Sequence, residues 1–214
     1  METKQVDVGK AIAYGWSEVK KNFWYFVGLA VIVIVIESIG SGPKEHRTYF
    51  NVLGLFLGAW MACGFTTIVL DYYGGTKREI TDVFTQVKDF WRVLGANILV
   101  GFIVLVGFIF LIVPGIYLGL RFIFTIPLII DKNLGIGEAM ERSSEMTKGI
   151  KMELFVFALT VIGVLLLGVI CLGVGIFVAM PVVWLAYIYI YKTMQNIQPA
   201  ANVQPVIKTA TPAQ

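Results

Sequence analysis

Histidine and cysteine are scarce in this 214-residue sequence, and their scarcity excludes several kinds of site. The single histidine, His46, has no partner with which to form a metal site or a Ser-His-Asp triad. The two cysteines, Cys63 and Cys171, show neither CxxC nor Cys/His spacing, so we expect two buried thiols rather than a disulfide or a metal pair. We therefore expect no metal and no other cofactor.

Catalytic signatures are missing as well. The sequence contains no P-loop, no His-Glu-x-x-His and no Gly-x-Gly-x-x-Gly that follows a strand and opens a helix. Most carboxylates lie in amphipathic segments with basic neighbours three or four residues away, as around Glu141 and Glu145, which is typical of a solvated helix face. No two carboxylates can be assigned to one cleft, so we expect that the protein is not an enzyme.

Charged residues make up only 14% of the chain, against roughly a quarter in soluble domains, and hydrophobic residues make up 57%. The apolar residues form six runs that approach or reach the roughly 20 residues needed to cross about 30 Å of hydrocarbon. This pattern predicts an all-α polytopic membrane protein, with six transmembrane helices arranged as three hairpins in a single domain over residues 1–192. The runs are Phe23–Gly40, Phe50–Leu70, Leu94–Val113, Gly115–Ile130, Leu154–Leu172 and Val174–Tyr191.

The basic residues fall almost entirely on one side of this arrangement. If the connecting segments alternate sides, one side receives the two termini and the second and fourth loops, and with them all of the 17 basic residues except Lys44, Arg47 and Arg121. Cytoplasmic loops carry the Lys/Arg excess, so we expect both termini in the cytoplasm and the chain in the plasma (inner) membrane. We interpret the net charge of +3 as a contact with anionic headgroups, not with nucleic acid. Residues 1–22 are polar and charged, so the first apolar run is expected to be a retained span rather than a signal peptide.

Three amphipathic segments, residues 5–22, 78–93 and 136–149, each precede a pair of spans. Each is expected to be a helix that packs on the base of the bundle, lies in the headgroup region, or does both. The chain then divides into three units of surface helix plus hairpin. These units are either parallel repeats or independent segments that share one solution to the same packing problem. Residues 193–214 are rich in Pro, Ala, Gln and Thr, and we expect a disordered cytoplasmic tail there.

Proline and glycine punctuate the spans. Pro114 and Gly115 are expected to form the turn of the second hairpin, and Pro127 and Pro181 to kink the fourth and sixth spans. Glycine spacings such as Gly115-x-x-x-Gly119 favour close helix contact. They leave open whether that contact is within one chain or between chains, so a homo-oligomer or another membrane protein is a candidate partner.

Arg121 is the one basic residue inside a span. Six residues past Gly115, it is expected about 9 Å below the external surface, at a depth similar to that of Glu37 in the first span. An unpaired Arg there costs on the order of 2.5–3.5 kcal/mol. The favoured interpretation is a structural pair with Glu37 or a bond to hairpin carbonyls. An anion or headgroup site near the outer leaflet and outward snorkelling are the alternatives.

A set of short motifs carries a resemblance to a known family. Pro114-Gly-Ile-Tyr, Arg121, Pro127-Leu-Ile-Ile-Asp-Lys, Glu138-Ala-Met-x-x-Ser and Met146-Thr-Lys-Gly-x-x-x-x-Leu-Phe occur together. In this respect residues 108–190 resemble a group of six-span bacterial and archaeal membrane proteins of unknown function, and are similar to the membrane domain of glycerophosphoryl diester phosphodiesterases. The soluble barrel with its metal carboxylates has no counterpart here, so the resemblance implies the architecture and not that activity.

Two classes of function fit these observations. The first is a non-enzymatic membrane interaction or lipid-handling module whose partners are membrane lipids, including anionic headgroups at the cytoplasmic face. The second is a small transporter or channel subunit with a site near Arg121. Besides Arg121, the polar groups of the spans are mainly Thr66, Thr67, Asn97, Thr125 and Thr160, which favours the first class.

Overall fold

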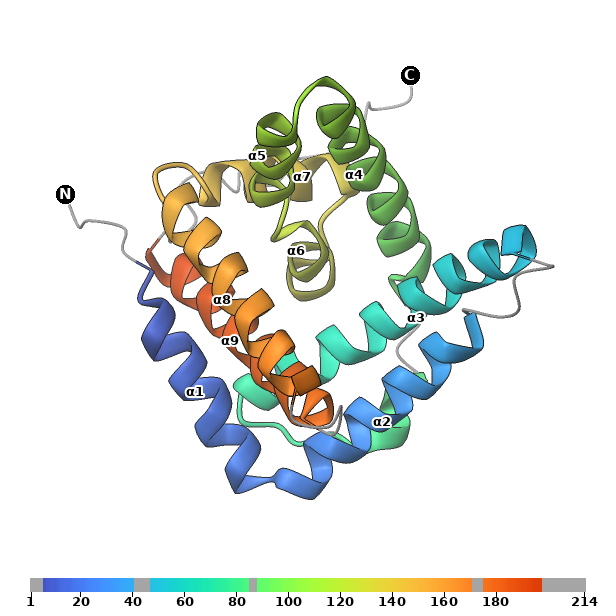
Figure 1. The fold of residues 1–214 in the computed structure, drawn as a ribbon, viewed down its shortest axis with the longest axis vertical. Coiled ribbons are helices and arrows are strands. Elements are labelled where there is room, and N and C mark those ends of the chain that lie inside the picture. Colours follow the sequence, from blue (N-terminus) through green and yellow to red (C-terminus); the bar gives the residue numbers. More distant parts are fainter. Residues whose placement is uncertain (1–5, 41–46, 85–87, 171–174, 198–214) are drawn as a thin grey trace, which may run out of the picture.

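The computed structural model describes residues 6–40, 47–84, 88–170 and 175–197, without the side chains of residues 37, 39–40 and 47–52 (Figure 1). These described residues form helices and no strands. His46, Cys171 and residues 198–214 of the predicted tail lie outside them, whereas residues 193–197 of that tail belong to the last helix and are not disordered as predicted. Cys63 is a buried free thiol. The elements are α1 (Val8–Lys21), α2 (Phe23–Gly40), α3 (Arg47–Tyr73), η2 (Ile80–Phe84), α4 (Phe90–Phe110), α5 (Ile112–Arg121), α6 (Thr125–Lys132), α7 (Ile136–Met146), α8 (Lys151–Ile170) and α9 (Ile176–Ile197).

Within this part of the chain, five spans are long and apolar enough to cross a membrane: Leu53–Tyr73, Phe90–Phe110, Ile112–Lys132, Lys151–Ile170 and Ile176–Ile197. A sixth is reached when α1 and residues 23–36 of α2, which meet at 103°, are counted as one bent span. The helices of each predicted hairpin contact each other, namely α2 with α3, α4 with α5, and α8 with α9. The chain is therefore an all-α polytopic membrane protein, as the apolar runs predict.

Helix α1 lies alongside α9 (Figure 1). Its N-cap is Asp7, whose carboxylate accepts the Lys10 N–H, and its buried residues Ala11, Gly15 and Val19 recur every four positions along one face. A Cβ on Gly15 would lie 2.3 Å from the carbonyl oxygen of Val182, so only glycine allows this approach of α1 to α9. The closeness of the two helices thus depends on one residue type.

The described residues of the second predicted surface helix do not form one helix, and the prediction of a helix over 78–93 is wrong. The chain instead forms the short 3₁₀ turn η2, and α4 begins at Phe90. Ile80, Thr81 and Val83 are β-branched and poor helix formers. Val83 is fully buried against α3, where a Cβ on Gly64 would lie 2.1 Å from the Val83 carbonyl oxygen. Packing against α3 therefore replaces helix formation in this segment.

The turn of the second hairpin lies at Leu111, which is extended, and not at the predicted Pro114 and Gly115. Pro114 occupies the first turn of α5, where its missing N–H has no helical partner in any case. Gly115 packs against α4, and a Cβ on it would lie 2.5 Å from the ring of Phe108. At the other predicted kink, Pro181 is buried within α9, which continues as one helix through it.

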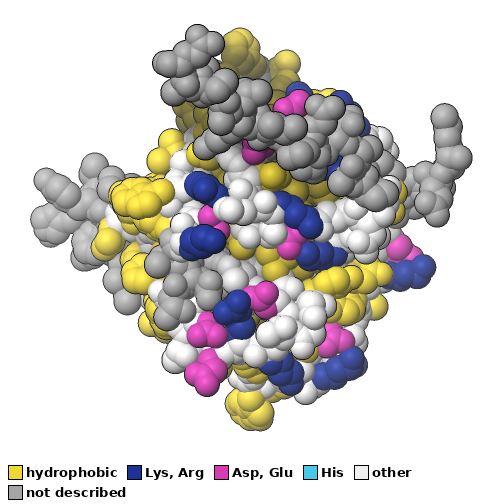
Figure 2. Space-filling view, turned by 180° about the vertical axis from the view of Figure 1, so that it is seen from behind, with side chains coloured by type: hydrophobic (Ala, Val, Ile, Leu, Met, Phe, Trp, Pro, Cys, Tyr) yellow, Lys and Arg dark blue, Asp and Glu magenta, His cyan; other side chains and the backbone are white. Residues whose placement is uncertain are grey.

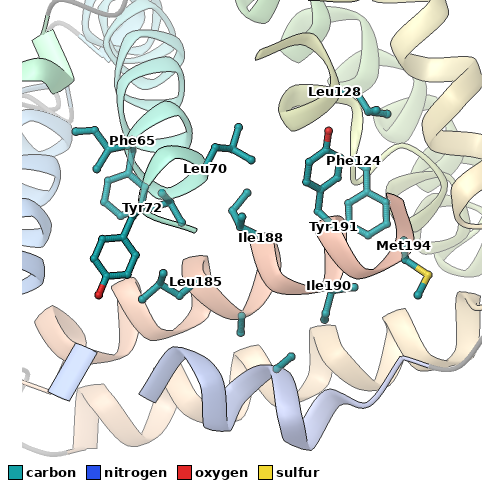
Figure 3. Close-up of a cluster of buried hydrophobic side chains, with 14 of the residues drawn as sticks. Phe65, Leu70, Tyr72, Phe124, Leu128, Leu185, Ile188, Ile190, Tyr191 and Met194 are labelled. Carbon is teal, nitrogen blue, oxygen red and sulfur yellow. The ribbon is translucent and has the colours of Figure 1, made fainter. Parts of the chain in front are cut away.

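The largest buried side chains surround α9. Figure 3 shows Leu185 and Ile188 of α9 near Phe65 and Leu70 of α3, and Tyr191 beside Phe124, which immediately precedes α6. The Phe124 and Tyr191 ring centroids are 5.9 Å apart. Helix α9 is therefore the element around which α1, α3 and the region of α6 are packed.

Candidate functional site

The fourth span is broken in its middle. Helix α5 ends at Arg121 and α6 begins at Thr125, with Phe122–Phe124 in a turn between them. Pro127 is the third residue of α6, where it has no N–H to offer the carbonyl four residues earlier and its ring clashes with that carbonyl. The kink predicted at Pro127 therefore takes the form of a break just before it.

Side chains from other helices bond the backbone groups that the break exposes. Ser143 of α7 accepts the Phe124 N–H at 3.1 Å and donates to the Arg121 carbonyl at 3.0 Å. The hydroxyl of Thr147, the residue after α7, lies 3.3 Å from the same carbonyl. The Tyr187 hydroxyl of α9 donates to the carbonyl of Ile123, the one that Pro127 leaves without a donor. Non-helical backbone at membrane depth is tolerated only where it is buried in protein or lines a water-filled cavity, and here protein side chains bond three of its backbone groups.

The end of α6 is joined to the end of α9 by a polar cluster centred on Asp131. Its carboxylate accepts hydrogen bonds from Lys192 at 2.7 Å, Tyr191 at 2.9 Å and Gln195 at 2.9 Å. Asp131 is largely buried, so this charge is both paired and fully hydrogen-bonded, which is the condition under which a buried carboxylate is stable. The cluster closes the C-terminal end of the broken span onto α9.

Arg121 lies beside α7 and α8. Its Nε donates to Ser144 Oγ of α7 at 2.7 Å, and its guanidinium carbon is 5.5 Å from the Phe122 ring centroid. Lys151, the first residue of α8, places its Nζ 3.5 Å from the ring centroid of Tyr117, one turn before Arg121 on α5. Arg121 is thus at the level where α8 begins, ten residues from the turn at Leu111, and not close below the opposite surface as its sequence position suggests. The Glu37 side chain lies outside the described residues, so its pairing with Arg121 stays a prediction.

A further candidate site lies beside Cys63. A cavity of about 180 Å³ is lined by Cys63, Thr67, Lys88, Asp89, Ile130 and Asn133. The hydroxyls of Thr66 and Thr125 are buried without a hydrogen-bond partner. Among the residues that the structure describes, no group of three or more His, Cys, Asp or Glu is placed to hold a metal ion.

Sequence reasoning identified Arg121 and Pro127 but missed Ser143, Tyr187 and Asp131 as their neighbours. The only signal for the missing residues was Pro127 itself, because a proline inside a span implies that some side chain bonds the freed carbonyl. Which side chain does so depends on how α7 and α9 fold back.

The matched family covers this region. Residues 115–197 match the family model described as the membrane domain of glycerophosphoryl diester phosphodiesterase. The match extends from Gly115 in α5 to the last residue of α9, so it includes the break, α7, the Asp131 cluster and the Arg121–Lys151 region. It confirms the resemblance that the motifs carry over the second part of the chain. No curated protein and no solved structure matched the chain.

Proposed function

We propose that this chain is a non-enzymatic integral membrane module that binds lipids at the headgroup level of the cytoplasmic leaflet. The observation that carries this proposal is the placement of exposed tryptophans where spans begin. Trp24, at the start of α2, is 82% exposed, and Trp91, at the start of α4, is 74% exposed. Tryptophan favours the membrane–water interface, so these rings are suited to contact headgroups and not water alone.

Basic residues near exposed tryptophan rings support the same function. Lys20 lies 5.6 Å from the ring centroid of the exposed Trp16, and Arg92 follows Trp91 directly. Figure 2 shows Lys and Arg side chains interspersed with Asp and Glu in the middle of one face, with hydrophobic side chains toward its edges. Lysine and arginine near the surface of an anionic leaflet each contribute about 1 kcal/mol to membrane attraction.

Transport stands second. A broken span with free helix ends is a common binding site in transporters. Here the bonds from Ser143 and Tyr187 use backbone groups at the break that a solute would need. A flux assay with the purified protein in liposomes tests this alternative directly.

The lipid proposal is tested by thermal unfolding of the full chain in nanodiscs of phosphatidylcholine alone and of phosphatidylcholine mixed with phosphatidylglycerol. We expect a higher Tm with the anionic lipid, and a gain that shrinks as salt is added. Trp24→Ala should reduce this gain more than Phe102→Ala, because Phe102 is similarly exposed at 63% but lies in the middle of α4. Equal Tm values for wild type in the two lipid mixtures would refute the proposal.

A further inference from the structure

The side chains of Arg121 and Lys151 both lie near Tyr117, at a lipid-accessible site where α5, α7 and α8 meet. Lys151 Nζ lies 3.5 Å from the ring centroid of Tyr117, and Arg121 follows Tyr117 by four residues on the same face of α5. Tyr117 is half-exposed, and the neighbouring Met152 is largely exposed on the apolar surface of α8. A ligand would therefore reach both cations from the side of the bilayer.

Neither cation is neutralised within the described part of the chain. No ion pair within 4.0 Å involves Arg121 or Lys151, whereas Lys192, Arg78 and Arg92 each have a carboxylate partner. Glu153 is two residues beyond Lys151, a spacing that places it on a different side of α8. Two neighbouring cations without a carboxylate repel each other, and an anion bound between them would remove that repulsion.

The donors have the chemistry that a phosphate group requires. The Ser144 bond uses Arg121 Nε and so fixes the guanidinium plane, which leaves the terminal N–H groups for two oxygens of one anion. Lys151 adds a compact charge, and the Tyr117 hydroxyl adds a neutral donor. Lys151 is the first residue of the candidate span Lys151–Ile170, whereas Arg121 is the tenth residue of the candidate span Ile112–Lys132. The site therefore extends inward from the edge of the membrane, where phospholipid phosphates lie, and the long side chains of Arg121 and Lys151 would reach a phosphate there.

We infer that Arg121, Lys151 and Tyr117 bind the phosphate of an anionic phospholipid headgroup, in the leaflet on the side where α8 begins. This inference rests on the proposed lipid-binding function and gives it a specific site. Ser144 is a positioning residue, since it orients Arg121. The acyl chains would then lie along the exposed apolar surface beside Tyr117 and Met152.

The test compares lipid binding by wild type and by the double variant Arg121→Gln/Lys151→Gln in native mass spectrometry with phosphatidylglycerol and phosphatidylcholine. The matched control is Lys88→Gln/Lys148→Gln, which removes the same charge from two exposed lysines elsewhere. We expect the site variant to weaken phosphatidylglycerol binding by about tenfold for each cation removed, and the control to change it little. Loss of the Arg121–Ser144 bond can also affect folding, so Lys151→Gln alone provides a second measurement, with about a tenfold loss expected.

The outcomes separate this inference from the proposed function. If wild type prefers phosphatidylglycerol and the site variants keep that preference, the site assignment is wrong although lipid binding stands. If wild type has no preference, both fail. Titration of inorganic phosphate into lipid-free protein in detergent tests whether the site binds a free anion in place of a lipid headgroup. A full Tm gain from phosphate alone, lost in the site variant, would overturn the lipid assignment in favour of a free anion.

Discussion

Replacement of Ser143 by alanine tests whether the contacts at the break hold the fourth span in place. Ser143 is fully buried in α7, and its hydroxyl makes two bonds to backbone groups about twenty residues earlier in the chain. The substitution removes an acceptor from the Phe124 N–H and a donor from the Arg121 carbonyl. The two losses are unequal, because Thr147 still lies 3.3 Å from the carbonyl, whereas no second acceptor is recorded for the N–H among the described residues.

The expected loss of stability follows from the unequal loss of these two hydrogen bonds. A buried group left without a partner costs about 1–3 kcal/mol, whereas a hydrogen bond between membrane helices contributes on average about 0.6 kcal/mol. Because the Phe124 N–H is at a break and has no bond within its own helix, the larger range applies. We therefore expect Ser143→Ala to destabilise the protein by about 1–3 kcal/mol.

The assay is unfolding of the detergent-solubilised protein, followed by circular dichroism as the denaturing detergent is increased. Ser38→Ala is the matched control, since the exposed Ser38 hydroxyl bonds the Ile34 carbonyl of its own helix, and a change of a few tenths of a kcal/mol is expected. If Ser143→Ala is no more destabilising than Ser38→Ala, the break does not depend on α7 and the reasoning is refuted.

Three further predictions address other parts of the molecule. Gly15→Ala should lower the stability by about 1–3 kcal/mol in the same assay, because the new methyl group meets the Val182 carbonyl. Gly58→Ala, where a Cβ meets nothing within 4 Å, should be nearly neutral. Equal effects of the two substitutions would contradict the close approach of α1 and α9. Burial raises the pKa of Glu18, but hydrogen bonds from Lys21 and Tyr72 outweigh this and hold the pKa below its ordinary value. The stability that this provides is present above the unfolded pKa of about 4.3 and is lost as pH falls through the folded pKa, so Tm profiles should show a smaller acid loss in Glu18→Gln than in wild type. Reporter fusions after Lys192 and within residues 43–49 should report opposite sides of the membrane, and a common side would show that the span count is wrong.

The sequence by itself determined the class of the fold and the position of most spans. An apolar run long enough to cross hydrocarbon is a local property, so α2 lies where its run predicts and the other candidate spans lie within a few residues of theirs. Pro127 likewise located the break to within a turn, because it removes the N–H that the Ile123 carbonyl would otherwise accept, although Pro181 shows that a helix can continue through a proline.

Only the tertiary structure decided how these elements are completed. Residues 78–93 have the apolar spacing of a surface helix, yet Ile80–Phe84 form the 3₁₀ turn η2, with Val83 packed against Gly64, and α4 begins only at Phe90. The partners of the break and of Asp131 come from about twenty to sixty residues away. Arg121 meets Ser144, and Tyr117 meets Lys151, because α7 and the start of α8 return to α5. Sequence spacing gives the depth of Arg121 along its own helix but not which helix end faces it. The helix end that faces Arg121 depends on the path of the chain after Lys132. The lipid site that we infer therefore depends on that path as well.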